Sequence, residues 1–189
     1  MSKTMTADRS LVHIAIYAAM IGALGLLPPF SLPMLGGVPI TAQTLGVMLA
    51  GTMLGPGRGA LAVLLFLFVV ALGMPLLAGG RGGLGVFAGP SVGFLVGWPI
   101  GAFVCGLMMR AMRAASTFTA ALVSAFVGGI LVMYAFGIPG LSLMTDLTLG
   151  QAAFGVLIYL PGDTLKVFAT AVIVRAVERG RPDAVLTRQ

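Results

Sequence analysis

Long apolar segments alternate with short polar or glycine-rich turns along almost the whole chain. This pattern is typical of membrane proteins, in which a spanning helix uses about 20 mostly apolar residues. The turns divide the chain into six apolar segments, so we predict six transmembrane helices, at about residues 11–27, 42–54, 60–72, 90–109, 118–136 and 151–174. The turns leave no room for an attached soluble domain. We therefore expect one all-α transmembrane domain over residues 1–189.

Proline and glycine mark where these helices end or bend. Pro28 and Pro29 cannot continue the first helix, and the last helix should be interrupted near Pro161 and Gly162. The segment after the third helix is the most unusual, because five of the seven residues from Gly79 to Gly85 are glycine. The fourth helix carries glycine at every fourth position (Gly93, Gly97 and Gly101), and such a row lets another helix approach closely.

Composition agrees with the membrane class and gives an orientation. Hydrophobic residues make up 59% of the chain, charged residues 8%, and the mean hydropathy is +1.09, which excludes an ordinary soluble domain. The net charge of +6 does not indicate nucleic-acid binding, because no basic run is interleaved with aromatic residues. With the N-terminus inside, nine of the eleven Lys and Arg residues fall on the cytoplasmic side. The positive-inside rule therefore predicts that both termini are cytoplasmic.

Asp163 and Lys166 form an opposite-charge pair inside the apolar final segment. Their spacing places both side chains on one helix face, one turn apart. An ionisable group at membrane depth costs about 2.5–3.5 kcal/mol on insertion scales, so such groups are usually functional. A carboxylate acceptor beside an ammonium donor is suited to a small polar ligand. The same pair is equally compatible with a structural ion pair.

Other polar features should meet this pair near the outer side of the membrane. Thr41 and Gln43 precede the second helix, and Tyr159 lies one turn before the pair; Gln43 is as compatible with a helix-terminal role as with ligand binding. Glycine backbones can approach a ligand closely, and successive amides can hold an anion. The candidate residues of this loop are Gly79, Gly80, Arg81, Gly82 and Gly83. Several segments converging at one depth indicate a binding pocket rather than a pore.

The first helix carries alanine at every fourth position, at Ala15, Ala19 and Ala23. Such a smooth face packs against another helix, either within this chain or on a partner.

Known catalytic and metal-binding patterns are missing from the sequence. Neither lysine lies in a Walker A loop, so we do not expect the chain to hydrolyse ATP. One histidine and one cysteine offer little for metal binding or nucleophilic catalysis. We expect no bound metal or cofactor and no enzymatic activity.

An ordered set of motifs resembles the BioY family, the biotin-capturing S components of energy-coupling factor (ECF) transporters. The resemblance extends over about residues 10–175, and its motifs lie at 38–47, 49–51, 73–75, 78–85, 89–91 and 159–163 with Lys166. It implies a six-helix bundle with an outward-facing site closed by the loops after helices one, three and five. Arg81 departs from the family pattern, in which a small or amide residue is common.

The resemblance also implies partners and a ligand. Biotin would present its ureido N–H groups to Asp163 and its carbonyl to Lys166, with help from Gln43 and Thr41, while its carboxylate meets the loop amides. Ala15, Ala19 and Ala23 match a face that docks on the transmembrane coupling protein, and cytoplasmic ATPase subunits would use the ATP. We therefore expect biotin uptake across the bacterial cell membrane. The alternatives are a partner-independent carrier or channel for another small solute, and a membrane assembly factor that binds no vitamin.

Overall fold

The structure is a computed structural model that describes residues 2–31 and 37–188, with side chains for 10–29 and 37–188. Its first four long helices are α1 (Ser2–Leu24), α2 (Gln43–Leu54), α3 (Pro56–Ala71) and α4 (Val92–Ala111). Two long composite helices follow. The first joins α5 (Thr117–Phe126), a π-helical stretch η3 (Val127–Val132) and α6 (Met133–Met144). The second joins α7 (Leu149–Val156), a 3-10 turn η4 (Leu157–Tyr159) and α8 (Leu160–Gly180).

The all-α prediction is confirmed for the described part of the chain. The only regular strands described there are the two-residue pair β1 (Phe30–Ser31) and β2 (Pro39–Ile40), in which Phe30 lies opposite Ile40. Three helical stretches are long and apolar enough to cross a membrane, namely Val92–Ala111, Thr117–Met144 and Leu149–Gly180. Shorter apolar helices lie at Ser10–Leu24, Gln43–Leu54 and Pro56–Ala71.

The predicted helix bounds agree within four residues for the second, third and fourth helices, and differ more for the others. The first helix begins at Ser2 rather than 11, and the last continues to Gly180 rather than 174, because polar residues remain helical beyond the apolar core. The predicted end of the fifth helix at 136 was wrong. The helix continues to Met144 with Pro139 inside it, and a capping box of Thr148 and Gln151 starts the next helix.

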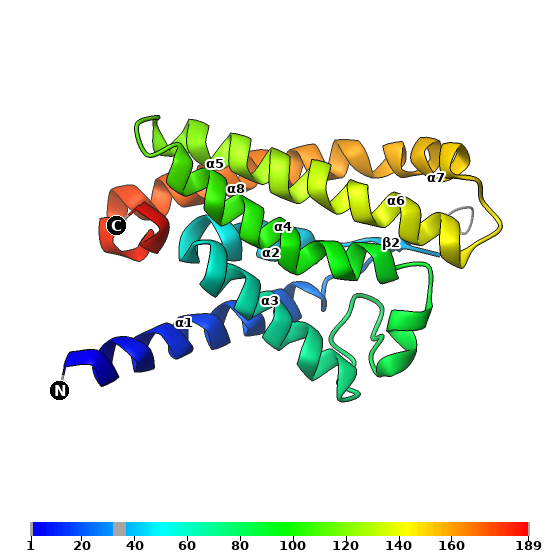
Figure 1. The fold of residues 1–189 in the computed structure, drawn as a ribbon, viewed down its shortest axis with the longest axis horizontal. Coiled ribbons are helices and arrows are strands. Elements are labelled where there is room, and N and C mark those ends of the chain that lie inside the picture. Colours follow the sequence, from blue (N-terminus) through cyan, green and yellow to red (C-terminus); the bar gives the residue numbers. More distant parts are fainter. Residues whose placement is uncertain (1, 32–36, 189) are drawn as a thin grey trace.

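The helices run lengthwise and both termini lie at the same end of the molecule (Figure 1). We call this the terminal end; it also contains the α2–α3 turn and the α4–α5 turn. The opposite end, the loop end, contains the connections 25–42, 72–91 and 145–148 (Figure 1). Residues 32–36, in the predicted loop after the first helix, lie outside the described part of the chain.

Helix α4 lies at the centre of the bundle and packs against α2, α3, η3 and α6. Its glycines make this possible. A Cβ atom on Gly93 would overlap the Phe136 carbonyl, and one on Gly106 would overlap the backbone of Pro56. The prediction that the glycine row of this helix supports close packing is confirmed.

The terminal half of the bundle is packed with small and medium apolar side chains. One cluster joins Met109 of α4 to Ala120 and Ala121 of α5 and Ala171 and Val174 of α8. The chain after α8 then folds back beneath this cluster as two 3-10 turns, η5 (Pro182–Ala184) and η6 (Leu186–Arg188), and buries Val185. Arg188 ties this segment down by donating to the carbonyls of Arg113 and Ala115 at 2.7 and 2.8 Å.

Candidate functional site

A cavity of about 600 Å³, its open mouth included, lies in the loop-end half of the bundle. It is bounded by the start of α2, one face of α4, the η3–α6 junction and the middle of the last helix. Its polar lining residues are Thr41, Gln43, Thr44, Arg81, Ser91, Tyr134, Tyr159, Asp163 and Lys166; its apolar ones include Leu77, Phe94, Leu95, Trp98 and Met133. This mixture of apolar, aromatic and polar lining residues is typical of small-molecule sites.

Asp163 and Lys166 lie together in the cavity wall, as their spacing predicts. Lys166 Nζ donates to Asp163 Oδ1 at 2.8 Å, and the side chains are 14% and 10% exposed, respectively. Tyr134 donates its hydroxyl to the other oxygen, Asp163 Oδ2, at 2.8 Å, and Lys166 also donates to Thr44 Oγ1 at 3.0 Å. The pair is thus held by three helices, and each carboxylate oxygen keeps acceptor capacity for a ligand.

Two local irregularities place these groups. The last helix tightens into the 3-10 turn η4 immediately before α8, so the interruption predicted near Pro161 and Gly162 is present and ends two residues before Pro161, at Leu157–Tyr159. In the neighbouring helix, the π-helical stretch η3 ends immediately before Met133 and Tyr134, which both line the cavity. Stretches of π-helix often occur at functional sites, because they change the direction of the side chains that follow.

Gln43 lies fully buried beside the cavity, and its amide binds three backbone groups. Its Nε2 donates to the carbonyls of Ile21 and Leu76, both at 3.1 Å, and its Oε1 accepts from the Ala78 amide at 2.9 Å. Both N–H bonds are therefore used within the protein. The geometry favours a bracing role that ties α1 to the glycine-rich loop, and leaves one lone pair on Oε1 for a ligand.

Thr41 and Tyr159 line the cavity as well, each with a hydrogen bond that shapes its wall. Thr41 Oγ1 accepts from the backbone N–H of Gln43, the first residue of α2, at 2.9 Å. Tyr159 donates to the Val38 carbonyl at 2.9 Å, which fixes the junction between η4 and α8 to the segment before β2. The Tyr159 ring meets Phe94 edge to face, with 6.3 Å between the ring centroids.

The glycine-rich loop contributes Arg81 to the cavity rather than its glycines. Leu77 and Arg81 exchange two backbone hydrogen bonds, and the turn between them requires positive φ at Gly79 (+80°) and Gly80 (+70°). Gly80 and Gly82 line a neighbouring hollow that shares Arg81 and Ser91 with the main cavity, whereas Gly79 and Gly83 line neither. The expected cradle of glycine amides is therefore not part of the main cavity.

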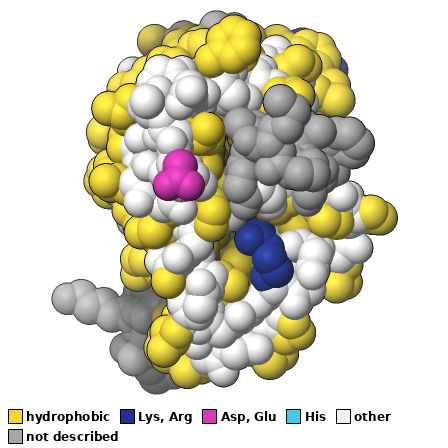
Figure 2. Space-filling model, turned by 90° about the vertical axis from the view of Figure 1, so that its right-hand side faces the viewer, with side chains coloured by type: hydrophobic (Ala, Val, Ile, Leu, Met, Phe, Trp, Pro, Cys, Tyr) yellow, Lys and Arg dark blue, Asp and Glu magenta, His cyan; other side chains and the backbone are white. Residues whose placement is uncertain are grey.

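The Arg81 guanidinium stands between the two hollows. It donates to the Ala78 carbonyl and to Ser91 Oγ, both at 3.2 Å. Partial burial lowers the pKa of Arg81 below its usual value, but guanidinium groups remain charged at neutral pH. Seen from the loop end, the described surface shows a basic group near its centre and an acidic group to one side, among apolar and uncharged groups (Figure 2).

Sequence reasoning missed several cavity residues: Thr44, Ser91, Phe94, Trp98 and Tyr134. Ser91, which immediately precedes α4, and Trp98 within α4 are seven residues apart and so face the same side of the helix, a spacing that was visible in the sequence. Tyr134 carried a weaker signal, a polar hydroxyl within an apolar segment. No local pattern indicated that it meets Asp163.

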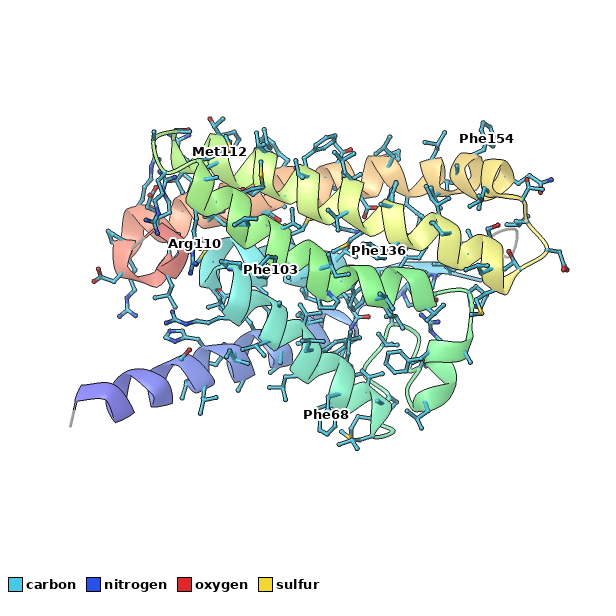
Figure 3. All side chains as sticks on the ribbon, viewed as in Figure 1. Phe68, Phe103, Arg110, Met112, Phe136 and Phe154 are labelled. Atoms are coloured by element: carbon cyan, nitrogen blue, oxygen red, sulfur yellow. The ribbon has the colours of Figure 1, made fainter. Side chains whose placement is uncertain are left out.

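Ala15, Ala19 and Ala23 are exposed along one face of α1, while Ile14, Ala18 and Ile21 point inward and are buried. The alanine row is therefore not internal packing in this chain. Apolar side chains elsewhere on the outer surface, such as Phe68 and Phe154, also project away from the bundle (Figure 3).

The described residues contain no group of three or more His, Cys, Asp or Glu side chains that could hold a metal ion. Cys105 is buried and is a free thiol.

The fold and the site together define a class: a multi-pass membrane protein with a small-molecule cavity at one end of its helix bundle. The cavity offers a carboxylate, an ammonium, a guanidinium and aromatic walls, which suits a small ligand with a polar head, an apolar body and an anionic tail.

Comparison with known proteins agrees with this class. The model of the BioY family matches residues 1–183. The biotin transporter BioY of Rhodobacter capsulatus is 46% identical, over 96% of this chain and 99% of that protein. That of Rhizobium etli is 49% identical, over 92% and 95%. The crystal structure of the S-component for biotin from an ECF-type ABC transporter superposes with a TM-score of 0.85 at 30% identity, covering 95% of both chains.

The chain belongs to the BioY family. The relatives are named as transporters, in agreement with the prediction that the chain is not an enzyme.

Proposed function

We propose that this protein captures biotin in the loop-end cavity and serves as the substrate-binding S component of an ECF-type importer. The observation that carries the proposal is the Asp163–Lys166 pair, held by Tyr134 and Thr44 in a cavity with aromatic walls. The names of its relatives, and the ligand named for the similar solved structure, support biotin as the ligand.

The pair complements the ureido ring of biotin. Asp163 accepts from the ring N–H groups. The Lys166 ammonium has three N–H donors, of which two bind Asp163 and Thr44, and the third donates to the ring carbonyl. Hydrogen bonds to charged groups contribute about 1.5–3 kcal/mol each. Two or three of them, with burial of the bicyclic ring against Phe94, Leu95 and Tyr159, are sufficient for nanomolar affinity.

Arg81 lies at the other end of the cavity, beside Ser91. It is the charged donor best placed for the carboxylate of the valeryl chain. Arginine pairs well with carboxylates because its planar N–H groups can donate two parallel hydrogen bonds. This orientation assigns the carboxylate to a side chain rather than to the glycine amides.

The bundle orients with its loop end outside and its terminal end in the cytoplasm. Arg58 lies in the first turn of α3 and Arg110 in the last turn of α4, both at the terminal end. Further cations at that end follow from the sequence: Arg113, Arg175, Arg179, Arg181 and Arg188. This asymmetry supports six spans, with both termini inside, in the bacterial cell membrane. Lys3 and Arg9 would add to it, but their side chains lie outside the described part.

The exposed alanine face of α1 supports docking on a transmembrane coupling protein. Ala15, Ala19 and Ala23 give it a smooth surface that another helix can approach closely. ATP hydrolysis would then be supplied by cytoplasmic ATPase subunits bound to that partner. No metal or cofactor is proposed for this chain.

Isothermal titration of the purified protein with a panel of vitamins tests the ligand. Biotin should bind with a dissociation constant in the nanomolar range, and vitamins without a cyclic urea should bind at least a hundredfold more weakly. Equal binding of an unrelated vitamin, or no binding of biotin, contradicts the proposal.

Uptake assays test the partner. Vesicles that contain only this chain should bind biotin without concentrating it, and adding the coupling protein and the ATPases should give ATP-dependent uptake. Accumulation without partners would favour a self-sufficient carrier.

The variant Ala19→Phe should lose uptake and keep binding. Val172 on α8 is 45% exposed, and Val172→Phe is the matched control for a bulky surface residue. This control should keep both biotin binding and uptake. Loss of binding in Ala19→Phe would contradict the docking proposal.

A further inference from the structure

Trp98 presents a buried hydrogen-bond donor with no acceptor. Its side chain lines the cavity and is 4% exposed, and its Nε1 finds no hydrogen-bond partner within the described chain. Among the described residues, the other buried side-chain N or O atom without a hydrogen-bond partner is Ser124 Oγ, and Ser124 does not line the cavity. Buried indole N–H groups normally have a partner, because leaving a buried donor unpaired destabilises a protein.

The orientation of this indole is fixed by its neighbours. Its ring stacks on Phe66 of α3, with 6.2 Å between ring centroids and 28° between planes, within a core cluster that also contains Met133 and Ala102. Rotating the indole to find an acceptor elsewhere would break this stack. With the indole held in this stack, no group of the described residues supplies an acceptor, and a ligand in the cavity that Trp98 lines is the candidate acceptor.

The position of Trp98 indicates which part of a ligand it meets. Ser91 precedes α4 at the loop end, and Trp98 lies seven residues further along, which is about 10 Å deeper. Arg81 bonds Ser91 at the shallow end. Lys166 lies across the cavity from α4 and is the deeper member of the ion pair, since α8 also runs from the loop end towards the terminal end. The carboxylate of a bound ligand would thus face Arg81, and its opposite end would face Trp98 and Lys166.

We propose that the Trp98 indole N–H donates to the ureido carbonyl oxygen of bound biotin, which also accepts from Lys166. This inference rests on the function proposed above and names a further ligand-binding residue. A carbonyl oxygen has two lone pairs, so it accepts both bonds, while Asp163 takes the ring N–H groups. A cyclic urea then pairs with Asp163, Lys166 and Trp98, and a ligand without that carbonyl leaves the indole unpaired.

Because Trp98 is the only tryptophan in the chain, its N–H can be observed directly. Protein labelled with ¹⁵N-tryptophan should give one indole ¹H–¹⁵N resonance in detergent micelles. Saturating biotin should move its proton downfield, as expected on hydrogen-bond formation. A resonance that does not shift while calorimetry shows biotin bound overturns the inference and leaves the proposed function intact. If wild-type protein binds no biotin, both fail.

The variant Trp98→Phe removes the N–H and keeps an aromatic ring. It should weaken biotin by about three- to tenfold, the effect of one hydrogen bond between neutral groups. The same substitution should lower the affinity for desthiobiotin, which keeps the cyclic urea and lacks the thioether ring, by the same factor. A loss confined to biotin would assign the N–H to the thioether sulfur and overturn the carbonyl assignment. Unchanged affinity for both ligands would overturn the role of Trp98.

A packing control separates lost ligand contacts from lost stability. Phe118, which meets Phe168 edge to face in the terminal half, lies away from the cavity. Phe118→Leu should lower the thermal midpoint and leave biotin affinity unchanged. If it weakens biotin as much as Trp98→Phe does, the effect of Trp98→Phe is one of packing, and the inference fails.

Discussion

The two halves of the bundle are built from the same six long helical stretches but differ in what lies between them. In the loop-end half, aromatic and polar side chains stand around a cavity of about 600 Å³. In the terminal half, alanine, valine and methionine fill the interior, and the segment after α8 covers the end. Residues of the terminal-half cluster, such as Met109 and Ala121, are completely buried.

This difference indicates that the cavity does not continue through the terminal half. On α8, the lining residues end at Lys166, and four residues later Thr170 is fully buried with its hydroxyl turned to the Lys166 carbonyl. A continuous pore would need polar residues along its length. A cup with a packed base suits binding, and release on the other side then requires a movement of the protein.

The largest expected effect comes from the ion pair at the base of the loop-end half. Asp163→Asn and Lys166→Ala should each weaken biotin at least tenfold in titration calorimetry, because each removes a charged partner of the ureido ring. Both variants should remain folded in detergent. Asp146→Asn, an exposed carboxylate in the loop before α7, is the matched control and should bind as wild type. Unchanged affinity in both variants would remove this site assignment.

The terminal half should be sensitive to added volume. In Gly51→Ala, the new methyl group would overlap the Ala102 carbonyl where α2 crosses α4. Overpacking of this kind costs about 1–3 kcal/mol, so the thermal midpoint should fall clearly. Gly57→Ala, which has nothing within 4 Å of the new atom, should leave the midpoint unchanged. Similar midpoints for the two variants would show that this crossing is not tightly packed.

Gln43 connects helices α1 and α2 of the loop-end half to the glycine-rich loop. Gln43→Leu keeps the volume and leaves the Ala78 amide and the carbonyls of Ile21 and Leu76 without their partner. We expect the free energy of unfolding to fall by about 1–3 kcal/mol, which should lower the thermal midpoint even without ligand. A residue that only contacts biotin would change affinity and leave the ligand-free midpoint unaffected.

Arg81 should have the smallest effect, because it is only partly buried and water screens its charge. Arg81→Gln should weaken biotin by about threefold to tenfold. It should also reduce the preference for biotin over biotin amide, which lacks the carboxylate. Calorimetry with both ligands measures this. An unchanged preference would mean that the carboxylate lies elsewhere.

Much of this molecule follows from local sequence. Apolar segment length indicated the helices, four-residue glycine spacing indicated the close packing of α4, and the i,i+3 spacing of Asp163 and Lys166 placed both in one wall. The errors fell at positions where local signals conflict. The fifth helix was predicted to end at 136, but it continues to Met144 with Pro139 inside it.

The partners of each site residue were decided by tertiary structure. Tyr134 meets Asp163 from 29 residues away, Thr44 meets Lys166 from 122, and Gln43 binds groups 22 to 35 residues distant. The π-helical stretch before Tyr134 shows why. A shift of one residue turns a side chain by about 100° around its helix, so small irregularities choose which groups meet. The sequence alone determined the membrane class, the helices and the charged pair, whereas packing between helices decided that Gln43 braces a loop and that Trp98 and Tyr134 belong to the cavity.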